Sequence, residues 1–325
     1  MKTSLKNPFT RLGVASTRSR FLPALMGGLA LILAGRVTAQ TFMTLHSFTA
    51  LNNSTNSGGA IPFAGLILSN NTLYGTAYRG GSSGNGTVFA VNTDGSGFTN
   101  LHSFTALDNN TNTDGANPYA SLILSSNILY GTAFGGGSSG RGTVFAVNPD
   151  GTGFTNLHSF TALNNNTNSD GANPYASLIV SSNILYGTAF GGGSSGKGTV
   201  FAVNTDGTGF TNLHIFTALS SNTNSDGANP YAGLILSSNA LYGTAEYGGS
   251  SGNGTVFAVN TDGTGFTNLH SFTTISFLTD GAHPYAGLIL SGNTLYGTAK
   301  IGGTSANGTV FDQVGRENVR AGRTL

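Results

Sequence analysis

A fixed period of 56 residues runs through this 325-residue chain and limits its fold more than any other feature. The period is marked by five histidines, which are His46, His102, His158, His214 and His270. Residues 117–163 and 173–219 differ at only four positions. Near-identical copies at a fixed spacing predict a repeat architecture in which each copy folds as one unit and packs on the next. Such a scaffold says little about its ligand.

One repeat contains four segments with the composition of β-strands. They are rich in β-branched and aromatic residues and are separated by clusters of Gly, Ser, Asn and Asp. In the third repeat these segments are 174–180, 184–190, 199–203 and 210–216. Three connections are short and one, residues 219–229, is long, and no stretch of the repeat shows helical periodicity. Three hairpins followed by one long crossover predict a four-stranded meander, which is the blade of a β-propeller.

The two ends of the repeat array predict the number of blades and how they close. Every strand type occurs five times, but the chain begins on a fourth strand, Phe42–Phe48, and ends after a third, Thr309–Phe311. Pairing these ends removes an open sheet edge. We therefore expect an all-β, five-bladed β-propeller of four-stranded blades over residues 40–312, closed by the N-terminal strand completing the last blade. An open β-solenoid is the alternative, but it needs atypical capping repeats.

Residues 1–39 have the layout of a secretory signal peptide. Basic residues precede an apolar run at 21–35, and Val37-Thr38-Ala39 supplies small residues at a cleavage site. The apolar run is shorter than the ~20 residues that a membrane span needs. We therefore expect an exported protein, extracellular, on the cell surface or in the periplasm, without membrane insertion after cleavage. We expect residues 313–325 to be a divergent, disordered tail.

Charge and cysteine content exclude several kinds of partner and site. Six of the 13 basic residues lie within residues 1–39, so seven remain against 12 acidic residues and the mature chain has a net charge near −5. A mildly acidic chain without a basic stripe excludes nucleic acid as an expected partner. The chain has no cysteine, which excludes disulfides and thiolate metal sites. We expect a monomer that is stabilised by burial and sheet hydrogen bonding.

Several short strings recur along the chain and together resemble a known family. Examples are Leu185-Tyr186-Gly187-Thr188, Gly198-Thr199-Val200-Phe201, Asp206-Gly207-Thr208-Gly209-Phe210, Leu213-His214 and Asp226-Gly227-Ala228-Asn229-Pro230. They resemble the GloVer tandem repeat of exported proteins from Verrucomicrobia and related bacteria. The resemblance covers Phe42 to about Phe311 and implies an exported repeat protein, with no catalytic residue to carry over. After Phe311 the string Asp312-Gln313-Val314-Gly315-Arg316 departs from the repeat, and no apolar anchor helix follows.

Two repeated polar features are better explained by structure than by ligand binding. The five histidines lie on the outermost strand of each predicted blade and are too far apart to share one metal ion. We expect them to pack or to form hydrogen bonds between blades. The Asp-Gly pairs, which begin at Asp94, Asp150, Asp206 and Asp262, are typical of tight turns. A calcium loop needs about six oxygen ligands, and each turn offers too few.

The long loops are the expected binding surface, because loops on a rigid scaffold commonly carry binding sites. They are Asn-rich, and a tyrosine follows each of the four that contain an aspartate, whereas the first copy has Gly58 in its place. We expect one weak sugar site per repeat, formed by the pairs Asp114 and Tyr119, Asp170 and Tyr175, Asp226 and Tyr231, and Asp280 and Tyr285. The alternative is a solvated crossover capped by Asx turns. A surface polysaccharide or another protein is the expected kind of partner.

Catalytic chemistry finds little support in the sequence. Glu246 and Glu317 are the only glutamates after residue 39, whereas a glycosidase needs two carboxylates flanking one bond. The Gly-rich loops resemble phosphate-binding loops, but each leads into a strand and not into a helix. We therefore predict no catalytic residue, no cofactor and no metal. The expected function is a non-enzymatic exported scaffold of unknown ligand, with a multivalent carbohydrate-binding propeller as the alternative.

Overall fold

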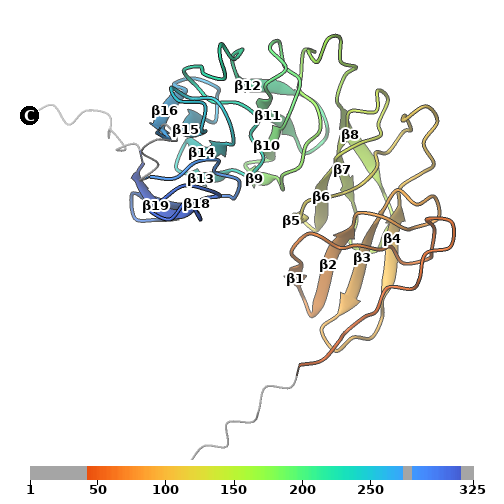
Figure 1. The fold of residues 1–325 in the computed structure, drawn as a ribbon. Helices are drawn as coiled ribbons and strands as arrows, with labels where there is room; N and C mark the ends of the chain where they lie inside the picture. The colour runs from red at the N-terminus through yellow and green to blue at the C-terminus, as the bar shows by residue number, and fades with distance from the viewer. Residues whose placement is uncertain (1–41, 274–279, 316–325) are drawn as a thin grey trace, which may run out of the picture. The chain divides into compact units, whose positions relative to one another are not determined.

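The computed structural model describes residues 42–273 and 280–315, which form five antiparallel β-sheets (Figure 1). The first sheet is β1 (Ile67–Ser69), β2 (Thr72–Ala77), β3 (Thr87–Asn92) and β4 (Thr99–Ser103). The second is β5 (Ile123–Ser125), β6 (Ile128–Ala133), β7 (Thr143–Val147) and β8 (Thr155–Ser159). The third is β9 (Ile179–Ser181), β10 (Ile184–Ala189), β11 (Thr199–Asn204) and β12 (Thr211–Ile215). The fourth is β13 (Ile235–Ser237), β14 (Ala240–Ala245), β15 (Thr255–Asn260) and β16 (Thr267–Ser271), and the fifth is β17 (Ile289–Ser291), β18 (Thr294–Ala299) and β19 (Thr309–Val314).

Within each sheet the strands lie in chain order, as a meander requires. The described part of the chain contains no helix that could span a membrane. The predicted signal peptide, residues 1–39, lies outside the described residues.

The first strand of each repeat is shorter than the sequence suggests. In the third repeat we expect a strand from Pro174, whereas β9 begins only at Ile179. Pro174 has no N–H to give to a ladder, and Asn173 before it has a φ of +58°. The apolar segment instead extends toward the preceding sheet, where the Thr132 hydroxyl donates a hydrogen bond to the Ala176 carbonyl oxygen at 3.0 Å. This segment therefore joins two neighbouring sheets.

The third and fourth strands are connected by the predicted Asp-Gly turn. In the third repeat Asp206 Oδ1 accepts hydrogen bonds from the hydroxyl of Thr208 at 2.6 Å and from its backbone N–H at 2.9 Å. These two bonds hold the pKa of the Asp206 carboxyl below its ordinary value. Gly207 has a φ of +84°, in a region that glycine adopts without steric cost. Turn chemistry therefore accounts for the Asp-Gly pair.

Consecutive sheets pack face to face, and the core lies between them. Tyr74, Val88 and Phe104 of the first repeat meet Leu122 and Phe145 of the second, and all five side chains are buried. Equivalent apolar layers lie between the second and third, third and fourth, and fourth and fifth sheets. Burying a side chain of this size contributes about 1.5–3 kcal/mol. Four-stranded meanders stacked through apolar layers are the blades of a β-propeller, which confirms the predicted fold class.

The last blade is incomplete among the described residues. β19 pairs with β18 only, so the fifth sheet has three strands. Val310 in β19 is 82% exposed, whereas the equivalent Val88 in β3 is fully buried. The strand runs to Val314, two residues past the predicted boundary at 312, because backbone pairing with β18 continues through Gln313.

Residues 42–48, which the sequence predicts to be a strand, form no strand in the structure, but part of this segment packs on the first blade. The Phe48 ring lies 5.3 Å from the Phe89 ring, and the His46 ring stacks on Phe98 at 3.5 Å. These contacts match those that a fourth strand makes with the following blade elsewhere in the chain, such as His102 on Phe154. Residues 46–48 therefore pack against the first blade in the way that the fourth strand of a preceding blade packs against the next one. Their pairing with β19, which would close the ring, stays a prediction.

Candidate functional site

Each four-stranded blade carries a His–Asp–Thr cluster, which we call the clamp. In the second blade His158 Nε2 donates to Asp170 Oδ2 at 2.9 Å, and the Thr161 backbone N–H and hydroxyl donate to the same carboxylate. The His158 ring also stacks on Phe210 of the next blade, with centroids 3.7 Å apart. The other clamps pair His102 with Asp114, His214 with Asp226, and His270 with Asp280. The histidines thus join neighbouring blades, as predicted.

The clamp carboxylates form hydrogen bonds that hold the loops that contain them. Asp170 is only 5% exposed. Burial by itself would raise the pKa of the Asp170 carboxyl, but hydrogen bonds from His158 and Thr161 outweigh it and lower the pKa below its ordinary value. The pKa of each of the other clamp carboxyls is lowered by the equivalent contacts. The four predicted site aspartates therefore hold the crossover loops in place.

We expect stability to fall as the pH drops below about 4. The folded-state pKa of each clamp aspartate lies below its value of ~3.9 in an unfolded chain. The clamp's contribution is therefore complete above the unfolded pKa and is lost as the pH falls through the folded pKa. Thermal unfolding between pH 7 and pH 2 should show this decline. It should be shallower in a variant with Asp114→Asn, Asp170→Asn and Asp226→Asn, and an equally steep decline there would contradict the assignment.

The segment before the first blade contains His46 but lacks the clamp carboxylate, because Gly58 occupies the position equivalent to Asp114. His46 keeps its stacking on Phe98. A Cβ built on Gly58 would lie 3.9 Å from His46 Nε2 and 3.1 Å from the Phe98 ring, and the backbone there is not left-handed. An aspartate therefore fits if the Phe98 ring shifts by a few tenths of an ångström.

Gly58→Asp is expected to raise the Tm by about 3–6 °C. One new hydrogen bond to a charged group contributes about 1.5 kcal/mol, and a chain of this size gains about 2–4 °C for each kcal/mol. Gly58→Ala is the matched control, because it adds the Cβ without the carboxylate. Thermal unfolding of both variants separates the effect of the carboxylate from that of the added Cβ. An equal rise in Tm in both variants would show that the carboxylate is not the cause.

The predicted site tyrosines gather in one row. Ring centroids are 5.5 Å apart for Tyr119 and Tyr175, 4.4 Å for Tyr175 and Tyr231, and 3.9 Å for Tyr231 and Tyr285. Burial raises the pKa of Tyr231, and hydrogen bonds with Tyr285 and Tyr119 raise it further. Among the contacts of the described residues, none joins one of these tyrosines to a clamp aspartate. The structure thus brings together tyrosines of successive repeats and not the expected Asp–Tyr pairs, whose binding of a ligand stays a prediction.

An asparagine side chain in the long loop forms hydrogen bonds with backbone groups. Asn168 Nδ2 donates to the carbonyl oxygens of Thr161 and Gly171, at 2.9 and 2.6 Å. Its Oδ1 accepts from the N–H groups of Gly171 and Gly193, at 3.0 and 2.8 Å. All four hydrogen-bonding positions of this amide are used. This side chain therefore supports the alternative of a capped crossover.

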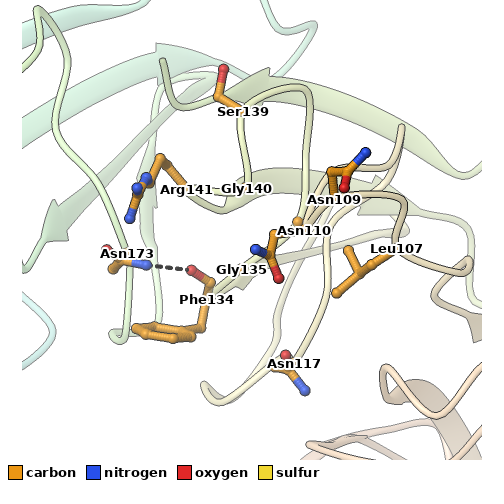
Figure 2. A pocket seen from close by; sticks show the side chains of 11 residues that line it. Leu107, Asn109, Asn110, Asn117, Phe134, Gly135, Ser139, Gly140, Arg141 and Asn173 are labelled. Carbon is orange, nitrogen blue, oxygen red and sulfur yellow. Dashed lines mark hydrogen bonds between the residues drawn. The ribbon is translucent and has the colours of Figure 1, made fainter. Parts of the chain in front are cut away.

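A surface pocket of about 470 Å³ lies beside the long loop that follows the first blade, residues 107–117. Figure 2 shows Arg141 and Asn173 on one side of it and Leu107, Asn109 and Asn110 on the other. Asn109 and Asn110 form the tip of a tight turn with φ values of +49° and +66°, a conformation that favours Asn over most residues. The Gly-rich loop between β6 and β7 forms the remaining wall. The pocket therefore combines three loops of two repeats.

An equivalent pocket of about 360 Å³ occurs two repeats further on, with different side chains. Its backbone frame is the same, because the His283 N–H donates to the Asn253 carbonyl oxygen at 2.8 Å as the Asn173 N–H does to Arg141. Seven equivalent positions line both pockets, and three of them differ: Tyr247 replaces Gly135, Asn253 replaces Arg141 and His283 replaces Asn173. Sequence reasoning missed this pocket, although the replacement of a glycine by Tyr247 is visible when the repeats are aligned.

Neighbouring residues orient the new side chains of this second pocket. Burial raises the pKa of Tyr247, and the neighbouring Glu246 carboxylate raises it further, so the phenol stays neutral. The His283 ring meets the Tyr247 ring at 5.0 Å and 64°, and its Nδ1 lies 3.1 Å from the Glu246 carbonyl oxygen. Because a carbonyl only accepts, Nδ1 carries the proton, which makes Nε2 an acceptor in the neutral ring.

The fold and the repeated loops define an all-β repeat protein built of β-propeller blades. The sequence profile described as the Gloeobacter/Verrucomicrobia repeat matches residues 35–169 and 161–319. The chain therefore belongs to this family, which confirms the predicted resemblance. A search of curated proteins found no match to the chain.

Solved structures that are similar to the chain are distant from it in sequence. The nidogen/laminin complex matches with a TM-score of 0.47 at 14% identity, covering 79% of this chain and 81% of that chain. The GH74 enzyme of Niastella koreensis matches with a TM-score of 0.47 at 17% identity, covering 80% and 36%. A 6-phosphogluconolactonase-like protein of Bacteroides uniformis matches with a TM-score of 0.45 at 17% identity, covering 79% and 72%. At these values none of them bears on the activity of this chain.

Proposed function

We propose that the chain is an exported, non-enzymatic β-propeller that serves as a scaffold outside the cytoplasm. The use of its repeated carboxylates carries this proposal, since they hold turns and clamps, as Asp206 and Asp170 do. Among the described residues no group of three or more His, Cys, Asp or Glu could hold a metal ion. Glu246, the one glutamate in the described ranges, is 6% exposed. These features favour a structural role over turnover.

Screening for hydrolysis tests this proposal. The mature chain is incubated with polysaccharides, phosphoesters and peptides, and product release is followed. We expect no turnover above that of buffer. Turnover that disappears in Glu246→Gln, while the fold is retained, would overturn the non-enzymatic assignment.

A second candidate function is multivalent carbohydrate binding, favoured by the recurrence of one pocket at equivalent places. Both pockets are surface cavities lined by asparagine, serine and backbone groups, which suit sugar hydroxyls. Weak sites repeated on one scaffold gain strength when several are engaged at once. The expected ligand is a surface polysaccharide that offers many copies of one sugar.

A glycan array tests the second candidate. The mature chain is applied as a dilute monomer and as a densely coated bead. We expect binding that is at least about 100-fold stronger on the beads, because avidity multiplies weak contacts. An array without a hit at high coating density would reject carbohydrate binding.

A further inference from the structure

We propose that the pocket lined by Tyr247 is the strongest of the repeated sites and binds the ring of a neutral pyranose by stacking it on Tyr247. This inference rests on the second candidate function and says which pocket dominates and which class of sugar it takes. It follows from the differences between two pockets that share one backbone frame.

Tyr247 supplies what the equivalent pocket lacks. Its side chain lines the cavity and the residue is 39% exposed, so one part of the ring is packed and another is accessible. The edge contact with the His283 ring, at 5.0 Å between centroids, restricts the direction of the Tyr247 ring before any ligand arrives. The C–H groups on one side of a pyranose are weakly positive, and the face of an aromatic ring is negative. A fixed, half-exposed ring is therefore a platform for a sugar.

The polar groups around Tyr247 suit sugar hydroxyls. Asn222 and Ser251 line the cavity, and His283 adds Nε2 as an acceptor. Asn222 lies at a turn tip with a φ of +68°, as Asn110 does in the other pocket. A few placed polar groups beside an apolar wall are the usual composition of a small-molecule site. Several such groups in one cavity favour a ligand with several hydroxyls.

Charge separates the two pockets further. The cavity beside β6 is lined by Arg141, whereas Asn253 holds the equivalent position beside Tyr247. No lining residue of the Tyr247 pocket carries a fixed charge, and Glu246 next to it is buried. A charged sugar would lose water there without gaining a counter-charge. The ligand class is therefore a neutral hexose or N-acetylhexosamine.

The chain itself offers a matched site into which the ring can be transplanted. A Cβ built on Gly135 would meet only the Ala116 carbonyl oxygen and Asn117 Oδ1, both at 3.9 Å, and its φ is not left-handed. A side chain can therefore begin at residue 135 without backbone strain or a clash of its Cβ. Gly135→Tyr should create a second ring platform on the same frame.

Titration of the full mature chain with methyl glycosides of glucose, galactose, mannose and N-acetylglucosamine tests the inference. The best ligand is then compared across variants by calorimetry, with the Tm recorded to confirm folding. Tyr247→Ala should weaken the tightest site about tenfold, the scale of one aromatic contact. Tyr247→Phe should stay within about threefold because it keeps the ring. Gly135→Tyr should add a second site in the stoichiometry.

The outcomes separate the inference from the function on which it rests. If no glycoside and no arrayed glycan binds the wild-type chain, carbohydrate binding itself is rejected. If a glycoside binds and Tyr247→Ala leaves its affinity unchanged, carbohydrate binding stands and the dominance of this pocket is wrong. Should Gly135→Tyr add no site while Tyr247→Ala loses one, the ring would not be what distinguishes the two pockets.

Discussion

Removing residues 40–50 should lower the Tm by roughly 10 °C or cause aggregation. The segment holds Phe48 against Phe89 and His46 against Phe98 on the first blade. A fully buried phenylalanine costs about 3–5 kcal/mol when it is lost, so losing the partly buried Phe48 together with the stacked His46 should cost about 3 kcal/mol, and a chain of this size loses about 2–4 °C for each kcal/mol. The same deletion removes the predicted partner of β19, whose Val310 is then left without cover.

Two point variants within this segment provide a matched control. Phe48→Ala removes a ring that packs on the first blade, whereas Phe42→Ala removes one that is 95% exposed. We expect most of the loss in Tm from Phe48→Ala and almost none from Phe42→Ala. Equal effects of the two would mean that the segment acts through something other than its packing on the first blade.

Asp170→Ala should destabilise the protein by about 3 kcal/mol, which corresponds to a loss in Tm of about 6–12 °C. The substitution leaves the Thr161 N–H and the His158 ring without the acceptor that they share. A buried donor without an acceptor lowers stability by more than one hydrogen bond contributes, because the donor gave up its hydrogen bonds to water on folding. Thermal or urea unfolding of the single variant measures the effect.

A double-mutant cycle shows whether the clamp acts as one unit. His158→Ala also removes the stacking on Phe210, so the loss in unfolding free energy of this single variant includes lost packing. If the clamp is coupled, the pair His158→Ala and Asp170→Ala should cost at least 1 kcal/mol less than the two single changes added together. Strict additivity would show that His158 and Asp170 stabilise the protein independently.

The period and the turn residues were sufficient to predict the architecture. A repeat that reads as three hairpins and one long crossover has few ways to fold, and the turn at Asp206 uses only contacts within a few residues of sequence. The start of the first strand was not predictable in this way. Pro174 and the apolar residues after it look like a strand locally, but Thr132 of the preceding sheet engages the segment.

The contacts of the candidate site residues were predicted less well than the fold, and whether these residues bind a ligand stays a prediction. Asp170 and Tyr175 are close in sequence, which suggested one shared site, yet Asp170 is taken by His158 and Tyr175 by its neighbouring tyrosines. His158 lies on the strand before the long loop, and the tyrosines that contact Tyr175 lie in other repeats. The short distance in sequence between Asp170 and Tyr175 does not reveal either set of partners. The Tyr247 pocket, in contrast, has a signal in the sequence that was overlooked. Treating the repeats as identical hid the one position where a glycine becomes an exposed ring.

Closure of the last blade by the N-terminal segment is the central claim, and disulfide trapping tests it most directly. In the four-stranded blades the first residue of the third strand pairs with the serine or isoleucine of the fourth, as Thr255 does with Ser271. The same register would place Thr309 opposite Ser47. Paired residues in an antiparallel ladder are close enough for a disulfide, and the chain has no cysteine of its own.

The full mature chain with Thr309→Cys and Ser47→Cys is oxidised at low concentration and analysed by mass and non-reducing gel mobility. The Thr255→Cys and Ser271→Cys pair serves as the positive control, and Ser47→Cys with Thr255→Cys as the negative one. Closure predicts an intramolecular disulfide between residues 47 and 309, seen as the mass of a monomer and as increased mobility in the non-reducing gel. Free thiols, or crosslinks between chains only, at a concentration where the positive control is fully oxidised would contradict closure.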